Sequence, residues 1–300
     1  MDTLLSRLAH RTGVTHAIVR HSVAFANSQA RVRRAFGGYT PTGRDVFVAT
    51  FMKSGTNWMM QIALQIAHRG EADFDHIHDL VPWPEAPSPG PIALDDPASW
   101  QGAPTGLRVI KTHGDAGSVP AHPDARYLVV LRDPGEVIVS AYHFALPLMG
   151  LRGAVSPDEW LRLVSPETGR NHWLEHTVSW WALRDAPNVE IFFYKDMKKD
   201  PGAAVDRVAA LMGVSLTPSE RAAVLERSSL SHMRSIQSAF RPIPLPFVTP
   251  RTLPDMIRRG ESGGTRELYT DAQLAHVRET ARTALRERCP DLPFGEALGA

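Results

Sequence analysis

The sequence predicts an α/β fold: a single domain with a parallel central sheet flanked by helices. Four short apolar runs have the length of strands and lack strict polar alternation, as in parallel strands covered on both faces. Helical patterns separate these runs, and such alternation is typical of sheets joined by right-handed crossovers. The chain has 300 residues, enough for one large domain of this class. The runs are Val46–Thr50, Leu107–Lys111, Tyr127–Leu131 and Val189–Tyr194.

Apolar residues recur at helical spacing in the segments between and after these strands. We find no internal repeat and no linker, so one domain is favoured. Two proline-rich segments, Pro82–Pro104 and Arg241–Pro254, are expected to be long surface loops, which in compact domains often carry function. The predicted helices are Thr56–Arg69, Glu136–Leu146, Asn171–Arg184, Asp206–Met212, Pro218–Arg227 and Asp271–Glu287.

The N-terminal region has a pattern of its own. The first 44 residues contain seven arginines and a single acid, Asp2, a composition shared with transit peptides. Helical spacing favours an amphipathic helix instead. We expect this helix to pack on its own domain, and binding to a membrane surface or a partner is the alternative. The residues at helical spacing are Val14, Ala17, Ile18, His21, Ala24 and Phe25.

Composition excludes several classes of protein. The net charge of +1 does not favour a nucleic-acid binder, so any anion site must be local. One cysteine, Cys289, allows no internal disulfide and indicates a reducing, cytoplasmic compartment. No apolar run is long enough to span a bilayer, and no Cys/His pattern is typical of zinc sites. The 28 arginines against five lysines indicate a GC-rich, bacterial genome.

The stretch FVATFMKSGTNW predicts an anion site where the first strand ends. Gly55 lets the backbone approach a ligand, and the N–H groups and dipole of the following helix favour an anion. Ser54 and Thr56 add hydroxyl donors, Lys53 adds a charge, and Trp58 offers a flat face to a base. The Walker pattern is absent because the lysine precedes the glycine. The alternative is a capped helix start with an exposed lysine.

Two further segments place polar side chains at the ends of strands. His113 follows the second strand, and its near-neutral pKa suits a general base. Arg132 ends the third strand, with Ser140 about two helical turns further on, so both can face one anion. The alternative for Arg132 is a surface ion pair with Asp133 or Glu136, which contributes little.

These motifs, in this order, resemble those of the cytosolic-type sulfotransferases, which take a sulfuryl group from 3′-phosphoadenosine 5′-phosphosulfate (PAPS). TFMKSGTNW is similar to the family's 5′-phosphosulfate loop, although Met52 replaces the usual proline and Asn57 stands where threonine is common. The resemblance spans about Arg44 to Thr270. It implies a P-loop-like strand–loop–helix site in a sulfotransferase domain, 44–300, with a helical extension, 1–43.

The resemblance implies a role for each matching residue. Lys111-Thr112-His113 is similar to the family's Lys-Thr/Ser-His, whose histidine is the catalytic base. The resemblance implies catalysis by His113, Lys53 and Lys111. It implies binding of PAPS by Lys53, Ser54, Gly55, Thr56, Asn57, Trp58, Arg132, Ser140, Tyr194, Ser228, Arg258, Arg259 and Gly260, and of the acceptor by Trp83, Phe144 and His113.

Two C-terminal departures from the family affect these expectations. Gly264 and Thr265 replace the Asp-Trp of the segment that closes over the 3′-phosphate. The dimer motif of some relatives is broken, with Ala275 at its last position, so that dimer is not expected, although an oligomer is possible.

The sequence therefore predicts transfer of SO₃ from PAPS to a hydroxyl of a small, apolar or aromatic acceptor, without a metal. Adenosine 3′,5′-bisphosphate (PAP) would be the product. Two alternatives are an inactive nucleotide-binding module and an ATP-dependent small-molecule kinase. A lumenal carbohydrate sulfotransferase is disfavoured, since this chain offers neither an anchor nor disulfides.

Overall fold

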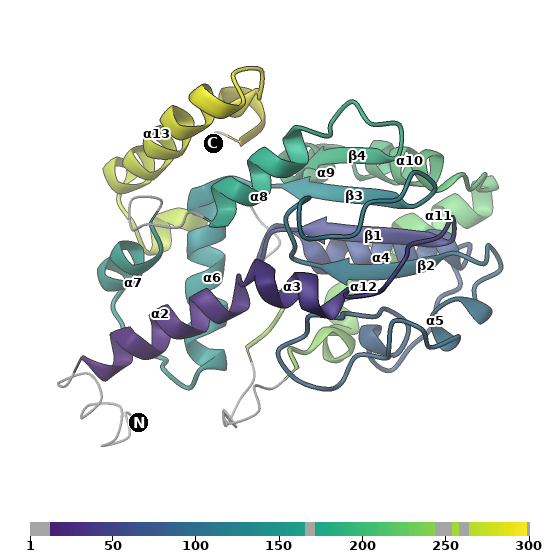
Figure 1. The fold of residues 1–300 in the computed structure, drawn as a ribbon, viewed down its shortest axis with the longest axis horizontal. Coiled ribbons are helices and arrows are strands. Elements are labelled where there is room, and N and C mark those ends of the chain that lie inside the picture. Colours follow the sequence, from purple (N-terminus) through teal and green to yellow (C-terminus); the bar gives the residue numbers. More distant parts are fainter. Residues whose placement is uncertain (1–12, 166–171, 244–253, 258–263, 299–300) are drawn as a thin grey trace.

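The computed structural model describes residues 13–165, 172–243, 254–257 and 264–298, and within these ranges a four-stranded sheet forms the centre (Figure 1). All neighbouring strands are parallel, and the strand order is β2-β1-β3-β4. The expected α/β fold with a parallel sheet is confirmed. The strands are β1 (Asp45–Thr50), β2 (Arg108–Thr112), β3 (Arg126–Leu131) and β4 (Val189–Phe193).

Each strand lies within one residue of its predicted position. β1 begins one residue early, because Asp45 pairs across the sheet with Arg108. Both side chains are buried, and Arg108 Nε donates to Asp45 Oδ1 at 2.8 Å. A buried charge is tolerated when it is paired and hydrogen-bonded in this way. The apolar runs alone do not predict this pair, since Asp45 precedes the first run and Arg108 is a charged residue within the second.

All six predicted helices are present, but some start earlier than their apolar spacing indicates. α6 begins at Pro134 because Asp133 caps it, accepting from the N–H of Glu136 at 2.8 Å. Asp200 caps α10 in the same way. The helices are α2 (Val14–Ala26), α3 (Gln29–Ala35), α4 (Thr56–Ala67), η1 (Ile77–Asp79), α5 (Ala98–Gln101), α6 (Pro134–Leu148), α7 (Pro157–Val164), α8 (His172–Trp181), α9 (Tyr194–Lys199), α10 (Pro201–Met212), α11 (Pro218–Arg227), α12 (Leu230–Ser235), η2 (Gln237–Phe240), η3 (Gly264–Glu267), α13 (Asp271–Arg288) and η4 (Phe294–Leu298).

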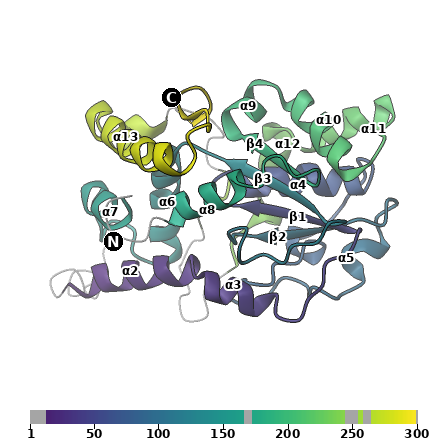
Figure 2. The ribbon, with the colours of Figure 1, turned by 45° about the horizontal axis from the view of Figure 1, so that its top comes forward.

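Helices cover both faces of the sheet, which explains the apolar strands (Figures 1 and 2). Val46 and Val48 of β1 point to one face and pack in a cluster with α4, α10 and α11. Phe47 and Ala49 point to the other face, against α3, α8 and α13. A third cluster, beyond the carboxyl ends of the strands, joins α2, α6, α7 and α13.

The N-terminal amphipathic helix forms as α2 and packs on its own domain as expected, but not through its apolar face. All six residues of that face are exposed. The helix packs on α7 through its opposite side, where Thr15 and Val19 are buried. His16 Nε2 lies 3.2 Å from Glu159 Oε1 of α7. None of the helices in the described part of the chain is both long and apolar enough to cross a bilayer.

Candidate functional site

A cavity of about 1270 Å³ opens beyond the carboxyl ends of β1, β2 and β3. Its volume exceeds the usual 300–1,000 Å³ of a small-molecule site, so there is room for two ligands. Arg258, Arg259 and Gly260 lie outside the described residues. Of the other predicted site residues, Ser54 is buried behind the lining, and the rest line this one cavity: Lys53, Gly55, Thr56, Asn57, Trp58, Trp83, Lys111, His113, Arg132, Ser140, Phe144, Tyr194 and Ser228.

The loop between β1 and α4 is shaped for close contact with a ligand. Lys53 has a left-handed backbone, with φ of 65°, and Gly55 has φ of 98°. A Cβ on Gly55 would lie 2.8 Å from Cδ2 of Tyr194. Glycine is therefore required for two reasons: the left-handed backbone disfavours other residues, and a side chain would clash with Tyr194. Ser54 Oγ is buried and has no hydrogen-bond partner among the described residues. An orphaned hydroxyl beside the N-terminus of α4 suits an anion.

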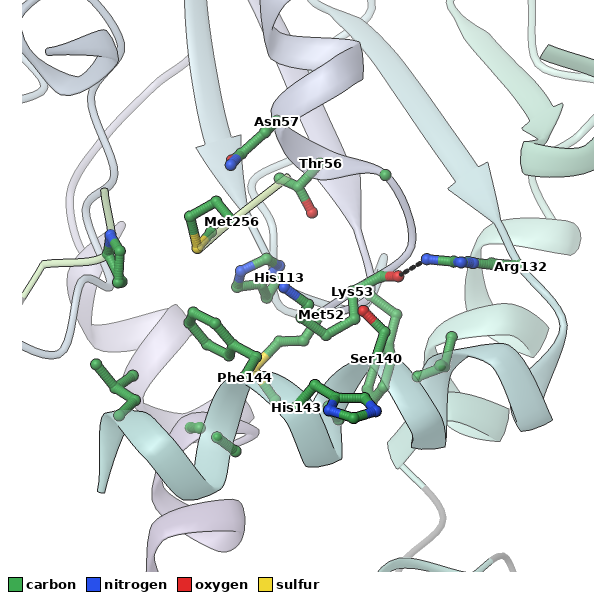
Figure 3. A pocket seen from close by; sticks show the side chains of 18 of the residues that line it. Met52, Lys53, Thr56, Asn57, His113, Arg132, Ser140, His143, Phe144 and Met256 are labelled. Atoms are coloured by element: carbon green, nitrogen blue, oxygen red, sulfur yellow. Dashed lines mark hydrogen bonds between the residues drawn. The ribbon is translucent and has the colours of Figure 1, made fainter. Parts of the chain in front are cut away.

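His113 lines the cavity, and the backbone holds one of its ring nitrogens (Figure 3). Its Nδ1 lies 2.8 Å from the carbonyl oxygen of Thr50. A carbonyl only accepts, so we assign the proton to Nδ1, and Nε2 keeps its lone pair. Burial and, next, the Lys111 ammonium hold the pKa of His113 well below its usual value. His113 is therefore neutral at pH 7 and able to accept a proton at Nε2.

Lys111 lies beside His113, under the ring of Trp83. Its Nζ is 3.4 Å from the Trp83 ring centroid, close enough for a cation–π interaction. Burial and, to a smaller extent, the charge of Lys53 lower the pKa of Lys111 to about 7, against the opposing effect of Glu85. Lys111 is thus a buried cation whose charge depends on the anions that surround it.

Glu85 is the residue that sequence reasoning missed. Its side chain is 2% exposed, and its Oε1 accepts the backbone N–H of His113 at 2.7 Å. Its Oε2 has no partner in the described structure, and burial raises the pKa of the carboxyl. The sequence did contain a signal, because Glu85 is the one acid in the apolar stretch LVPWPEAP, from which only Trp83 was nominated.

Arg132 and Lys53 lie together at the other side of the loop (Figure 3). Arg132 Nη1 donates to the carbonyl oxygen of Lys53 at 2.8 Å, and its guanidinium carbon is 4.2 Å from the Tyr194 ring centroid. The predicted alternative, an ion pair with Glu136, is also present at 2.9 Å. Lys53 Nζ lies 4.1 Å from the ring centroid of Phe144. Arg132 therefore braces the loop while it lines the cavity.

Tyr194, Trp58 and Ser228 form a third side of the cavity. The rings of Trp58 and Tyr194 meet edge to face, with centroids 5.9 Å apart. The hydroxyl of Ser228 donates to the carbonyl of Val224 at 2.7 Å, so toward a ligand this oxygen can only accept. The two aromatic rings offer the flat apolar surface that a base requires.

Comparison with known proteins identifies relatives of the chain. Residues 43–287 match a family model described as "Sulfotransferase domain". Rat sulfotransferase 1C2 is 25% identical over 239 residues, which cover 76% of this chain and 79% of the relative. Human sulfotransferase 2A1 is 25% identical over 257 residues, covering 83% and 85%.

Two solved structures share the fold. A retinol dehydratase in complex with androsterone and PAP has a TM-score of 0.67 at 19% identity, covering 88% of this chain and 87% of the other. Mouse sulfotransferase SULT7A1 with PAP has a TM-score of 0.64 at 21% identity, and the match covers 91% of this chain and 93% of the mouse protein. At these identities the structures establish the fold alone.

Proposed function

This chain belongs to the family of proteins with a sulfotransferase domain, and on that premise we propose that it moves a sulfuryl group from PAPS to a hydroxyl of a small apolar or aromatic acceptor. One observation supports the proposal above all: His113, with its Nδ1 held by the Thr50 carbonyl, lines the same cavity as Lys53 and Lys111. A general base and two cations around one space are what transfer of an anionic group to a hydroxyl requires.

The loop after β1 fits a phosphosulfate. The orphaned hydroxyl of Ser54, the N–H groups at the start of α4 and the bare Cα of Gly55 can surround an anionic group. We assign Arg132 and Ser140 to the 3′-phosphate, and Trp58, Tyr194 and Ser228 to the adenine. The two solved relatives hold PAP, the expected product. Arg258, Arg259 and Gly260 keep their proposed role at the 3′-phosphate.

The chemistry follows from the positions of three side chains. When bound, PAPS supplies the sulfuryl group. Nε2 of His113 takes the proton of the acceptor's hydroxyl group while the hydroxyl oxygen forms its bond to sulfur. Lys53 stabilises the charge on the phosphate oxygen as its bond to sulfur breaks, and Lys111 stabilises the sulfuryl oxygens. Charge stabilisation of this kind is usually the largest catalytic contribution. The proposal requires no metal.

The acceptor side of the cavity is apolar. Trp83 and Phe144 line it together with Phe51, Met52 and Met256, so an aromatic or aliphatic alcohol fits better than a sugar. Androsterone in the retinol dehydratase structure is a ligand of that protein, and it supports the same chemical class here. A panel of phenols, steroids and long-chain alcohols, assayed with labelled PAPS, identifies the acceptor.

PAPS, but not ATP, is expected to raise the Tm of the protein, because ATP lacks a 3′-phosphate. Arg132→Ala is expected to weaken the binding of PAP at least about tenfold, since a hydrogen bond to a charged group contributes roughly 1.5–3 kcal/mol. The same variant should lose far less affinity for adenosine 5′-phosphosulfate, which has no 3′-phosphate and is affected only through the loop that Arg132 braces. Thermal shift and calorimetry measure both effects.

The matched control is Arg152→Ala, at an exposed arginine outside the cavity lining. If the variant bound PAP and adenosine 5′-phosphosulfate equally weakly, Arg132 would not contact the 3′-phosphate. Stabilisation by ATP as strong as that by PAPS would favour the kinase. Binding of PAPS without transfer to any acceptor of the panel would favour the inactive module.

We further propose that Glu85 is a positioning residue, acting through His113 and Lys111. Lys111 faces the charged groups Glu85 and Lys53 and the two histidines His78 and His113. Among these four, Glu85 alone can be negative. Its carboxylate opposes the loss of the Lys111 proton, while its Oε1 fixes the backbone of His113.

Glu85→Gln is expected to move the alkaline limb of kcat/KM for PAPS to lower pH. Protonated Lys111 attracts the anionic donor, so the wild-type rate falls as pH rises through the Lys111 pKa of about 7. Glutamine still accepts the backbone N–H of His113 but carries no charge. The pKa of Lys111 therefore falls, and the alkaline limb moves to lower pH with it. Glu85→Ala removes both the acceptor for the His113 N–H and the negative charge, so it should also lower kcat. Superimposable profiles for Glu85→Gln and the wild type would leave Glu85 a structural residue only.

Four expectations from the sequence stay predictions: the division into 1–43 and 44–300, the cytoplasmic location, the bacterial origin and the absence of the family's dimer.

A further inference from the structure

The outer face of α2 is an apolar surface that the proposed function does not use. We call its six residues the α2 stripe: Val14, Ala17, Ile18, His21, Ala24 and Phe25. Val14, Ile18 and Phe25 are 47%, 40% and 50% exposed, and they are three of the five large apolar side chains that the described part of the chain leaves exposed. Such clustering on one helix marks an interaction surface rather than scattered exposure.

The α2 stripe is continuous with the cavity. Its C-terminal half, His21, Ala24 and Phe25, belongs to the cavity lining, whereas Val14 and Ile18 extend beyond that lining. Figures 1 and 2 both show α2 at the edge of the molecule, beside α7. The stripe therefore forms an apolar path from the outer surface to the space that contains His113.

The segment that contains the stripe is basic, although Glu159 of α7 contacts His16 of α2. Residues 13–44 contain five arginines and no acid, and Arg20, Arg33 and Arg34 are exposed on α2 and α3. An apolar helix face in an arginine-rich segment is typical of helices that lie in the interface of an anionic bilayer. A second copy of the chain fits less well, because it would bring the same arginines against these and repel them.

We propose that the α2 stripe docks on the surface of a bilayer that contains anionic lipids, and that membrane-dissolved acceptors enter the cavity along it. The docking is inferred from the exposed residues alone, whereas the entry of acceptors also depends on the proposed function. The two parts are therefore tested by separate measurements.

Docking is tested by flotation of the full chain with vesicles of phosphatidylcholine, with and without phosphatidylglycerol. We expect binding to the anionic vesicles, and about a tenfold weaker partition for Ile18→Asp, which loses an apolar contact and adds a repelled charge. Leu183→Asp is the matched control, since Leu183 is also 40% exposed but lies on another part of the surface, and it should bind as the wild type does. Neither residue lines the cavity.

A second pair of substitutions guards against a folding defect. Arg33→Glu with Arg34→Glu should abolish the preference for anionic vesicles without touching the stripe. Equal binding of Ile18→Asp and wild type, or no binding of the wild type, overturns the docking. A dimer that Ile18→Asp dissociates, without any vesicle binding, shows a second copy on the stripe and overturns it too.

Entry is tested by sulfuryl transfer to a long-chain alcohol presented in anionic vesicles. Ile18→Asp should lower kcat/KM for this acceptor about tenfold, in step with its partition, and leave transfer to a water-soluble phenol unchanged. Loss of both activities would contradict the entry route. A wild type that binds vesicles but transfers to neither acceptor would refute the proposed function and leave the docking intact.

Discussion

Replacement of His113 by alanine is expected to lower kcat by about 10²–10⁴-fold, the usual contribution of a general base. The reason lies in the bond between Nδ1 and the Thr50 carbonyl, which leaves Nε2 as the one ring nitrogen able to accept a proton from the acceptor. PAP affinity should stay within about twofold, because the base acts on the acceptor and not on the nucleotide. Steady-state kinetics and calorimetry on the same preparation measure the two quantities.

The control for this variant is His276→Ala, at an exposed histidine of α13 away from the cavity, which should leave kcat unchanged. The pH dependence gives a second readout. Burial and Lys111 hold the pKa of His113 well below its usual value, so a wild-type acid limb due to His113 should lie below pH 6.5. A His113→Ala enzyme with undiminished kcat would show that another group takes the proton.

Lys53→Met is expected to lower kcat by about 10²–10³-fold, as loss of one preorganised group that stabilises transition-state charge does. Methionine keeps most of the length and apolar contact of the side chain against Phe144 but removes the charge. Both residues have a Cβ, so the cost of the left-handed backbone at this position is similar, and the loop should keep its shape. Single-turnover measurements with bound PAPS isolate the transfer step from product release.

Lys199→Met, at an exposed lysine outside the cavity lining, controls for the loss of one positive charge. If Lys53 acts on the departing phosphate oxygen, its loss lowers kcat more than it raises the Kd for PAPS. A variant with weak PAPS binding but normal turnover at saturation would restrict Lys53 to ground-state binding.

The strands and the order of the motifs were predictable from the sequence. A strand buried on both faces is mostly apolar, and Val46–Ala49 of β1 show that signal in a strand whose six residues are all buried. A chain that turns from β1 into α4 also needs residues that tolerate its backbone, and Gly55 is visible as such a residue in the sequence. Local chemistry decides these features, so local sequence reveals them.

The tertiary structure alone decided which residues complete the site. His113 takes its hydrogen bonds from positions 28 and 63 residues away, at Glu85 and Thr50, and no spacing in the chain predicts such contacts. The orientation of α2 was equally beyond the sequence. Periodicity identifies an apolar side of a helix, but burial requires a neighbour, and α7 packs on the opposite side at Val19. The apolar face of α2 is therefore left exposed at the edge of the cavity, because packing partners are a property of the fold and not of the helix.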